Sequence, residues 1–369
     1  MRVAVLLEQL LGSVPGGTGR YSRELATALA GTADTGDALT GWVAAHRHVG
    51  AARIAGVAGP RPLPLPRPVL NRLAPHRLAP GPRGADVVLA PTALALPGRR
   101  VPLVATVHDT VPYTDPDTMS ARSRDWHRAM TALVLRRAAA ILVPTRAVAA
   151  DLPRRVAGVD PARVHVTGEG ASAAVTTMPP DAHERARRLG LPERYLLTLS
   201  TLEPRKGLDV ALRSLADPHD AGLPLLVVGQ PGWGGTDPAA AARGLGLAPG
   251  RVRVLGRLDD ADVAVCLARA AAVLVPSRSE GFGLPVVEAM ALGTPVVISD
   301  APALVEVAGG AAEIAPVGDS GALAVAVAAA SDPATRALRA AAGREQASRH
   351  TWEAAARRTW EVLRSVTGR

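Results

Sequence analysis

Short apolar runs alternate with helical patterns along almost the whole chain, and this alternation predicts an α/β fold. The runs are continuous and bounded by turn residues, which is typical of strands buried on both faces of a parallel sheet. They fall in two series, the first at 3–7, 86–90, 102–107, 139–144 and 163–167, the second at 195–200, 224–229, 251–256, 271–276 and 294–299. Helical patterns lie between several of the runs, the clearest at 18–30 and 120–138. Each series predicts one doubly wound, Rossmann-like domain.

The two series imply two domains. A chain of 369 residues exceeds what one hydrophobic core ordinarily holds. The segment after the first series is polar and contains Pro179-Pro180, so we place the boundary near residue 175. The predicted domains are 1–175 and 176–351, with a last helix at about 352–369 that packs back on the first. Two open domains of this kind create a cleft between the carboxyl ends of their strands, where ligands bind.

The chain offers little for cysteine or membrane chemistry. Its single cysteine, Cys266, excludes an intrachain disulfide and a cysteine zinc site. The apolar run at the N-terminus is too short for a secretory signal. The nearest candidate for a span, 322–330, falls far below the roughly 20 apolar residues that a membrane requires. A cytoplasmic location is therefore expected.

The net charge of +9 lies almost entirely in the first half of the chain. Residues 1–185 carry 22 arginines against 14 acids, whereas the rest carry 20 basic residues against 19 acids. Such a basic face suits phosphate on nucleic acid, on a lipid surface or on an anionic substrate. Nucleic acid is the weakest of these, since the sequence has no helix-turn-helix or zinc-finger spacing and only 2% aromatics. The arginine-rich helices expected near 122–137 and 146–155 are candidates for the contact, with a solvated arginine face as the alternative.

Lys206 is the only lysine among 42 basic residues. It stands beside Arg205 in LEPRKG (202–207), directly after the run 195–200 and just before a helical pattern. Two cations at a strand end suit a diphosphate that must be neutralised while a bond breaks. An ammonium is a compact charge and a guanidinium a rigid fork, so a requirement for a point charge explains the lysine. The alternative is a lysine left by chance on a solvated turn.

The segment SEGFGLPVVEAMALGTPVV (279–297) carries the strongest signal in the chain. It follows the run 271–276 and contains Glu280 and Glu288 with seven residues between them. Its glycines permit close backbone approach, and Pro285 suits the first turn of a helix. The pattern predicts a strand, a glycine loop and a helix start whose N–H groups can receive phosphate oxygens. The two carboxylates can then hold two sets of sugar hydroxyls.

This segment resembles the E-x7-E signature of retaining glycosyltransferases of family 4, which have the GT-B architecture of two Rossmann-like domains. LEPRKG resembles the phosphate-binding turn of the same family, and GGTGRYSRELATALA (16–30) and VHDTVP (107–112) follow its expected order. The resemblance covers nearly the whole chain, and the E-x7-E block is its most specific part. The implied fold class is therefore α/β, GT-B, with two doubly wound domains facing across a cleft.

The resemblance implies a role for each matching residue. Glu280 would contact the donor sugar near the reacting centre, and Glu288 would bind the nucleotide ribose. His108 would meet the donor sugar, although a histidine that merely caps a strand end is the plain alternative. Gly16 and Gly17 would approach the phosphate or the acceptor. The diphosphate would be bound by two side chains and two backbone groups, those of Arg205, Lys206, Gly283 and Leu284.

Two segments depart from the family pattern. Ser200-Thr201 stands where many members have Gly-Arg with a phosphate-binding arginine, and Arg205 is expected to supply that charge. The turn that closes the first domain reads TGEG (167–170) in place of the usual Pro-Asn-Gly, which blurs the linker.

The sequence thus predicts a retaining transferase that moves a hexose from a nucleoside diphosphate sugar to an acceptor hydroxyl. The E-P-R-K-G and H-D-x-x-P forms most resemble mannosyltransferase branches, which favours GDP-mannose, while UDP- and dTDP-sugars stay open. No cofactor and no obligatory metal are expected, because Asp115-Pro-Asp117 has D-x-D spacing but lies in a predicted turn. The acceptor is a glycan, a lipid-linked precursor or a small molecule, and a peripheral contact with an anionic inner membrane surface is an open alternative.

Three rival classes stay open at this point. A sugar-nucleotide epimerase can share the fold but acts without an acceptor. A phosphorylase that uses pyridoxal phosphate needs a Schiff-base lysine, for which Lys206 is the only candidate. A DNA-binding protein would bind duplexes with a steep dependence on salt.

Overall fold

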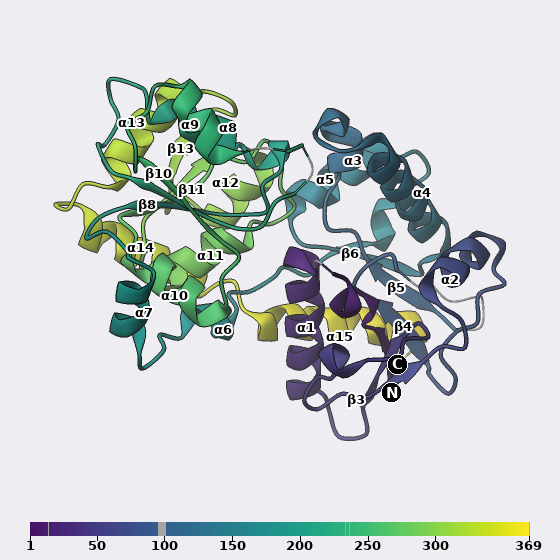
Figure 1. Cartoon of the computed structure of the whole chain (residues 1–369). Coiled ribbons are helices and arrows are strands. Elements are labelled where there is room, and N and C mark those ends of the chain that lie inside the picture. Colours follow the sequence, from purple (N-terminus) through teal and green to yellow (C-terminus); the bar gives the residue numbers. More distant parts are fainter. Residues whose placement is uncertain (14, 95–100, 233, 236, 369) are drawn as a thin grey trace. The chain divides into compact units, whose positions relative to one another are not determined.

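The computed structural model describes residues 1–13, 15–94, 101–232, 234–235 and 237–368. The chain forms two compact units, coloured along the sequence in Figure 1. Unit 1 comprises Met1–Thr110, Asp125–Glu169 and Thr351–Arg369, and unit 2 comprises Val111–Arg124 and Gly170–His350. None of the described helices is long and apolar enough to cross a membrane.

Unit 1 is built on a parallel sheet. In the part of the chain that the structure describes, this sheet has seven strands in the order β3-β2-β1-β4-β5-β6-β7. All neighbours pair in parallel, as between Val3 and Leu39 of β1 and β2. The strands are β1 (Arg2–Leu6), β2 (Ala38–Val43), β3 (Ala58–Pro62), β4 (Val87–Ala90), β5 (Leu103–Thr106), β6 (Ala140–Val143) and β7 (Val164–Val166).

Helices cover both faces of this sheet. Its helices and 3-10 turns are η1 (Glu8–Leu11), α1 (Gly16–Gly31), η2 (Gly50–Ala52), α2 (Arg67–Leu73), η3 (Ala74–His76), α4 (Ala121–Arg137), α5 (Arg146–Arg155), η5 (Pro161–Arg163) and α15 (Trp352–Thr367), and the division between the units falls within α4. Apolar side chains of α2, α4 and α5 join one core cluster with the sheet, among them Leu70, Leu133 and Leu152. The last helix, α15, lies beside α1 (Figure 1).

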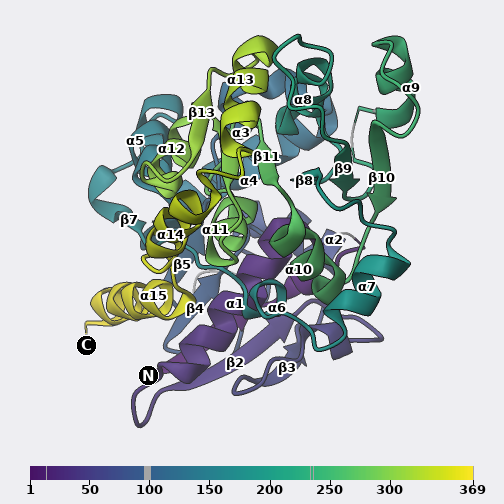
Figure 2. The same cartoon turned by 90° about the vertical axis from the view of Figure 1, so that its left-hand side faces the viewer.

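Unit 2 repeats the plan with a six-stranded parallel sheet among the described residues, in the order β10-β9-β8-β11-β12-β13 (Figure 2). Its strands are β8 (Leu196–Leu199), β9 (Leu225–Val228), β10 (Val252–Gly256), β11 (Ala272–Val275), β12 (Val296–Ser299) and β13 (Glu313–Ala315). The central strands are buried along their whole length, which agrees with their continuous apolar sequences.

Helices also cover both faces of the second sheet. They are α3 (Val111–Thr114), α6 (Ala173–Thr176), α7 (Ala182–Arg188), α8 (Leu208–Ser214), α9 (Pro238–Gly244), α10 (Asp260–Arg269), α11 (Leu284–Ala291), α12 (Pro302–Ala308), α13 (Ser320–Ala330) and α14 (Arg336–Ala347), with 3-10 turns η4 (Pro116–Thr118) and η6 (Pro204–Lys206). α8 packs on α13 at one face, and α11 packs on α14 and α10 at the other (Figures 1 and 2). The core cluster on the α8 side includes Leu208, Leu212 and Leu323.

The ten predicted strands are all present, and the structure adds three that the apolar pattern does not reveal. β2 (ALTGWV) is interrupted by Thr40-Gly41, so it lacks a continuous apolar run. β3 (AGPRP) contains two prolines and lies at the edge of the sheet, where proline is tolerated. β13 has only three residues and also lies at an edge, that of the second sheet.

The units are not divided by one boundary near residue 175. Segment 111–124 belongs to unit 2, and segment 351–369, which contains the predicted last helix, belongs to unit 1. That 1–175 and 176–351 fold as separate domains stays a prediction.

Candidate functional site

The two sequence motifs lie at the carboxyl ends of neighbouring strands in unit 2. β8 pairs directly with β11. From this pair the sheet continues to β9 and β10 on one side and to β12 and β13 on the other. The chain order therefore reverses between β8 and β11, which is where doubly wound sheets bind ligands, just outside the strand ends. Segment 200–207 follows β8, and segment 276–283 follows β11.

A tight turn presents the two cations of the first motif. η6 ends at Gly207, whose φ of 67° lies in the left-handed region. A Cβ at this position would lie 2.0 Å from the carbonyl oxygen of Pro276, so glycine alone fits here. The turn and the segment after β11 are thus in direct backbone contact.

Arg278 fixes the same turn from the second motif. Its backbone N–H donates to the carbonyl oxygen of Arg205 at 2.8 Å. Its guanidinium donates to the carbonyl oxygen of Pro204 at 2.8 Å, and to the two carboxylate oxygens of Asp209 at 2.9 and 2.8 Å. This bidentate ion pair ties the turn to the first residues of α8.

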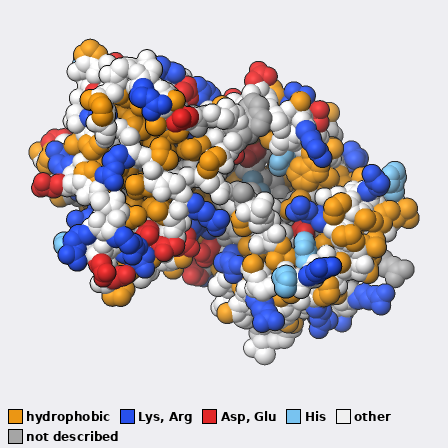
Figure 3. Space-filling view, viewed as in Figure 1, with side chains coloured by type: hydrophobic (Ala, Val, Ile, Leu, Met, Phe, Trp, Pro, Cys, Tyr) orange, Lys and Arg blue, Asp and Glu red, His pale blue; other side chains and the backbone are white. Residues whose placement is uncertain are grey.

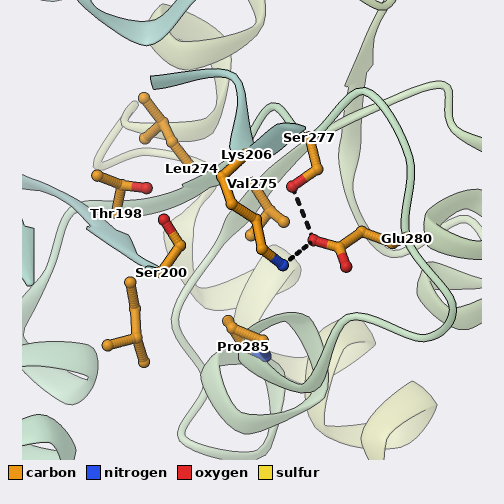
Figure 4. A pocket seen from close by; sticks show the side chains of 9 residues that line it. Thr198, Ser200, Lys206, Leu274, Val275, Ser277, Glu280 and Pro285 are labelled. Carbon is orange, nitrogen blue, oxygen red and sulfur yellow. Dashed lines mark hydrogen bonds and ion pairs between the residues drawn. The ribbon is translucent and has the colours of Figure 1, made fainter. Parts of the chain in front are cut away.

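The carboxylate of Glu280 binds both cations of the turn, and Figure 4 shows its contacts with Lys206 and Ser277. Lys206 donates from Nζ to Oε1 at 2.6 Å, and Arg205 donates from Nη1 to Oε2 at 3.0 Å. Ser277 donates from Oγ to Oε1 at 2.8 Å. The Lys206 and Glu280 side chains are only 20% and 9% exposed. The structure therefore brings Arg205, Lys206 and Glu280 into one cluster.

This cluster lines a small hollow at the strand ends (Figure 4). The lining combines hydroxyl, charged and apolar side chains from both motifs, those of Thr198, Leu199, Ser200, Lys206, Leu274, Val275, Ser277, Glu280 and Pro285.

The electrostatics of the cluster favour an anion. Burial opposes ionisation of Glu280, but the charges of Lys206 and Arg205 outweigh it and lower the pKa of this carboxyl to about 2. Burial and the charge of Arg205 lower the pKa of Lys206 despite the attraction of Glu280. Arg205 also lies 3.9 Å from Oε2 of Glu203, so each carboxylate of the site is paired with a cation. Adjacent cations of this kind are neutralised equally well by phosphate oxygens.

A glycine loop leads from Glu280 into α11. Gly283 precedes the helix with a φ of 99°, and a Cβ there would lie 2.6 Å from Cδ2 of Leu304. The loop's Phe282 is 4% exposed, and its ring lies 5.5 Å from that of His350 in an edge-to-face arrangement. Leu284 begins α11, and Glu288 lies one turn further along, 2% exposed and outside the set that lines the hollow.

The other predicted residues lie in unit 1. Gly16 and Gly17 begin α1, and a Cβ on either would meet no described atom within 4 Å, so their backbone is open. His108 follows β5, with Nε2 at 2.8 Å from the carbonyl oxygen of Pro91 and Nδ1 at 3.8 Å from Oε1 of Glu169. The roles assigned to all of these residues from the resemblance stay predictions.

Several residues that shape the cluster are not predicted from the sequence. Ser277 stands three positions before Glu280 directly after β11, so a hydroxyl at a strand end was an available signal. Arg278 and Asp209 are 69 positions apart, and no local pattern connects them.

Family models of glycosyltransferases match both halves of the chain. Residues 15–173 match the model described as Glycosyltransferase Family 4, and residues 193–332 match the model described as Glycosyl transferases group 1.

Curated relatives are similar over part of the chain. O-antigen chain mannosyltransferase B of Escherichia coli is 36% identical over 163 residues, which cover 43% of this chain and 42% of that protein. Phosphatidyl-myo-inositol mannosyltransferase of Mycobacterium leprae is 36% identical over 170 residues, 44% of each. The matched stretch thus spans less than half of each relative's length.

Solved structures are similar over the whole chain. Sucrose-phosphate synthase from Thermosynechococcus elongatus has a TM-score of 0.75 at 22% identity and covers 100% of this chain and 99% of its own. Anabaena HepE in complex with UDP-glucose has a TM-score of 0.74 at 20% identity and covers 99% and 100%. Together with the two parallel sheets, these likenesses confirm the predicted GT-B fold.

Proposed function

We propose that this chain, whose family models, relatives and fold support a GT-B glycosyltransferase, transfers a hexose from a nucleoside diphosphate sugar to an acceptor hydroxyl with retention at the anomeric carbon. The favoured donor is GDP-mannose, since two relatives are named as mannosyltransferases and the E-P-R-K-G turn resembles that branch. The acceptor is a hydroxyl of a glycan or of a lipid-linked precursor.

The cluster at Glu280 is the observation that carries this proposal. Arg205 and Lys206 both bind Glu280 at the switch point of a doubly wound sheet, and two adjacent cations at this position suit a diphosphate. A bound diphosphate would replace Glu280 as the partner of Arg205 and Lys206. Glu280 would then accept hydrogen bonds from the sugar hydroxyls. Glu288 would accept hydrogen bonds from the ribose.

The proposed chemistry relies on stabilising the leaving group. Lys206 and Arg205 neutralise the charge that develops on the diphosphate as the glycosidic bond to the sugar breaks. The leaving phosphate itself takes the proton of the acceptor hydroxyl, so no protein base is assigned. Because the two cations supply this charge, no obligatory metal is proposed, and turnover is expected to be the same with and without a chelator.

A nucleotide screen tests the proposal most directly. A ligand at 100 times its Kd stabilises the folded protein by about 2.7 kcal/mol. GDP, as the nucleotide of the favoured donor, is expected to raise the melting temperature more than UDP, dTDP or ADP. GDP-mannose is expected to yield a glycosylated product, and NMR should show that its anomeric configuration matches that of the donor. Failure of all four nucleotides to shift the melting temperature would contradict the proposal.

Two other outcomes identify alternative activities. A larger shift with UDP would favour a UDP-sugar donor, which the likeness to HepE solved with UDP-glucose supports. An isomerised sugar nucleotide formed without acceptor would identify an epimerase.

The basic first unit is proposed to meet an anionic acceptor at a membrane surface. On the face of unit 1 that Figure 3 shows, blue side chains outnumber red ones. In unit 1, Trp126 of α4 is 36% exposed and Arg154 of α5 is exposed, residue types suited to an anionic interface. Flotation with anionic liposomes is expected to carry the protein at low salt. Loss of flotation on Arg154→Glu would support α5, and no flotation at any salt would indicate an acceptor away from membranes.

A further inference from the structure

A buried polar cluster in unit 1 lies outside the cation cluster of unit 2. It joins His108, after β5, to Glu169, after β7, and to Tyr21 of α1. Their exposure is low, with side-chain values of 18% for His108 and 6% for Glu169 and a residue value of 1% for Tyr21. A histidine and a carboxylate at this depth need polar partners, because burying either without them is unfavourable.

Both ring nitrogens of His108 face oxygen atoms that only accept hydrogen bonds. Nε2 lies 2.8 Å from the carbonyl oxygen of Pro91, so this nitrogen carries a proton. Nδ1 lies at ion-pair distance, 3.8 Å, from Oε1 of Glu169. A neutral imidazole has one N–H and would turn a lone pair toward the carboxylate. The imidazolium has two N–H groups and satisfies both sides.

Aromatic packing holds the ring in this orientation. The Tyr21 ring lies 4.6 Å from the His108 ring at 89°, an edge-to-face contact. The Tyr21 hydroxyl is hydrogen-bonded to Oγ1 of Thr106 at 3.1 Å, and its ring also contacts Trp352 at 5.7 Å. A rotated His108 ring would lose the bond to Pro91.

The charged groups around His108 act in the same direction. Burial lowers the pKa of His108, but Glu169, the carbonyl of Pro91 and Asp109 outweigh it, and the pKa is raised. Burial raises the pKa of Tyr21, which stays neutral. Two more titratable groups lie near the cluster, Arg358, which donates to the carbonyl oxygen of Thr167 at 3.1 Å, and His127, which interacts with Asp109.

We propose that Glu169 is a positioning residue that holds His108 as a fixed imidazolium, with Nε2–H donating to the carbonyl oxygen of Pro91 and Nδ1–H facing the Glu169 carboxylate as an ion pair inside unit 1. His108 then supplies a constant positive charge, and it does not accept a proton. The charge state follows from unit 1 alone, whereas its consequence for sugar transfer rests on the function proposed above.

NMR titration of the histidine rings tests the charge state without any substrate. The His108 signal is identified by its absence in His108→Gln. In the wild type it is expected to titrate above the ordinary value of about 6.5, and in Glu169→Gln at least about one unit lower. Asp217→Asn removes a carboxylate 3.0 Å from a different histidine, His219, and should leave the His108 signal unmoved.

Two results would overturn the proposal. One is a wild-type His108 that titrates at or below about 6.5, which needs no variant. The other is an unchanged titration in folded Glu169→Gln. If Glu169→Gln does not fold, Glu169→Asp is measured in its place. Because Glu169→Asp keeps the negative charge, it should lower the pKa of His108 less than the roughly one unit expected for loss of the carboxylate.

The pH profile of transfer supplies the functional readout. A downward shift of about one unit lowers kcat/KM of Glu169→Gln by up to about tenfold at pH 8.5 relative to wild type, and hardly at pH 5.5. An equal loss at both pH values would indicate a merely structural role and overturn the positioning role. If the wild type transfers no sugar at all, the proposed function fails, and the NMR titration still decides the charge state.

Discussion

At the scale of single residues, the geometry accounts for the one lysine of an arginine-rich chain. The Nζ of Lys206 reaches Oε1 of Glu280 at 2.6 Å beside the guanidinium of Arg205, within a hollow lined by hydroxyl and apolar side chains. A second planar guanidinium would need more width than an ammonium at this point. The spacing of charges, rather than their number, therefore explains the residue type.

Removal of this ammonium is expected to slow transfer with little effect on the fold. We expect Lys206→Ala to lower kcat/KM by about 100- to 1,000-fold, because a charge aimed at the leaving group acts in the transition state. Lys206→Arg should recover less than a tenth of the wild-type rate despite keeping the charge. Steady-state kinetics with the preferred donor measure both. The control is Arg349→Ala, whose side chain is 65% exposed on the surface of unit 2. Wild-type kinetics in Lys206→Ala would remove the assigned role.

Glu280 predicts a stability change at acid pH. Its pKa is lowered to about 2, so its ion pairs contribute stability above its ordinary pKa of about 4.3, and this contribution is lost as the pH falls toward 2. The difference in urea midpoint between wild type and Glu280→Gln should be constant from pH 8 to 5 and shrink from pH 4 to 3. The lowered pKa of Lys206 acts only at alkaline pH and leaves this window unaffected. A constant difference down to pH 3 would argue against the ion pairs.

At the scale of elements, the turn η6 owes its position to contacts from the segment after β11. The backbone of Gly207 touches that of Pro276, and Arg278 binds the turn and Asp209 together. The turn after β8 and the segment after β11 are thus in direct contact, and each restrains the conformation of the other.

Gly207 and Gly222 provide a matched pair of substitutions. Both have a φ near 70°, but a Cβ at Gly207 would lie 2.0 Å from a carbonyl oxygen, and one at Gly222 would meet nothing within 4 Å. We expect Gly207→Ala to lower the free energy of unfolding by about 3 kcal/mol or more, and Gly222→Ala by about 1 kcal/mol. Urea unfolding measures both. Equal losses would show that backbone strain alone matters and that the close approach does not.

At the scale of the whole molecule, the last helix returns the chain from unit 2 to unit 1. Trp360 of α15 is 1% exposed and donates from Nε1 to the carbonyl oxygen of Leu29 at 3.3 Å. Arg364 pairs with Asp34 and Asp37 at 2.5 and 3.0 Å. α15 is therefore an integral part of unit 1, although it follows all of unit 2 in the sequence.

Trp360→Ala is expected to destabilise unit 1 by about 3–5 kcal/mol, because it leaves a large cavity against α1. Leu338→Ala on α14, where the side chain is 75% exposed, should change stability by no more than about 0.5 kcal/mol. Urea unfolding followed by Trp fluorescence measures both, and the binding of nucleotide by Trp360→Ala reports on unit 2 separately. Unchanged stability in Trp360→Ala would mean that α15 is dispensable to unit 1.

The sequence by itself determined the class of fold and the place of the cation cluster. Continuous apolar runs are local signals of buried parallel strands, and ten of them recur as β1, β4–β12. The cation turn and the E-x7-E segment each follow such a run, so the strand pattern already places them at sheet edges. These inferences hold because apolar runs and the turn-forming residues that follow them are patterns among neighbouring residues.

Only the tertiary structure decided which distant groups meet. The pairing of Arg278 with Asp209 across 69 positions and the pairing of His108 with Glu169 leave no trace in any local pattern. β2, β3 and β13 likewise became strands because a neighbouring strand offers them backbone partners, not because their sequences are apolar. Pairings of this kind depend on the packing of the whole unit, which no single segment encodes.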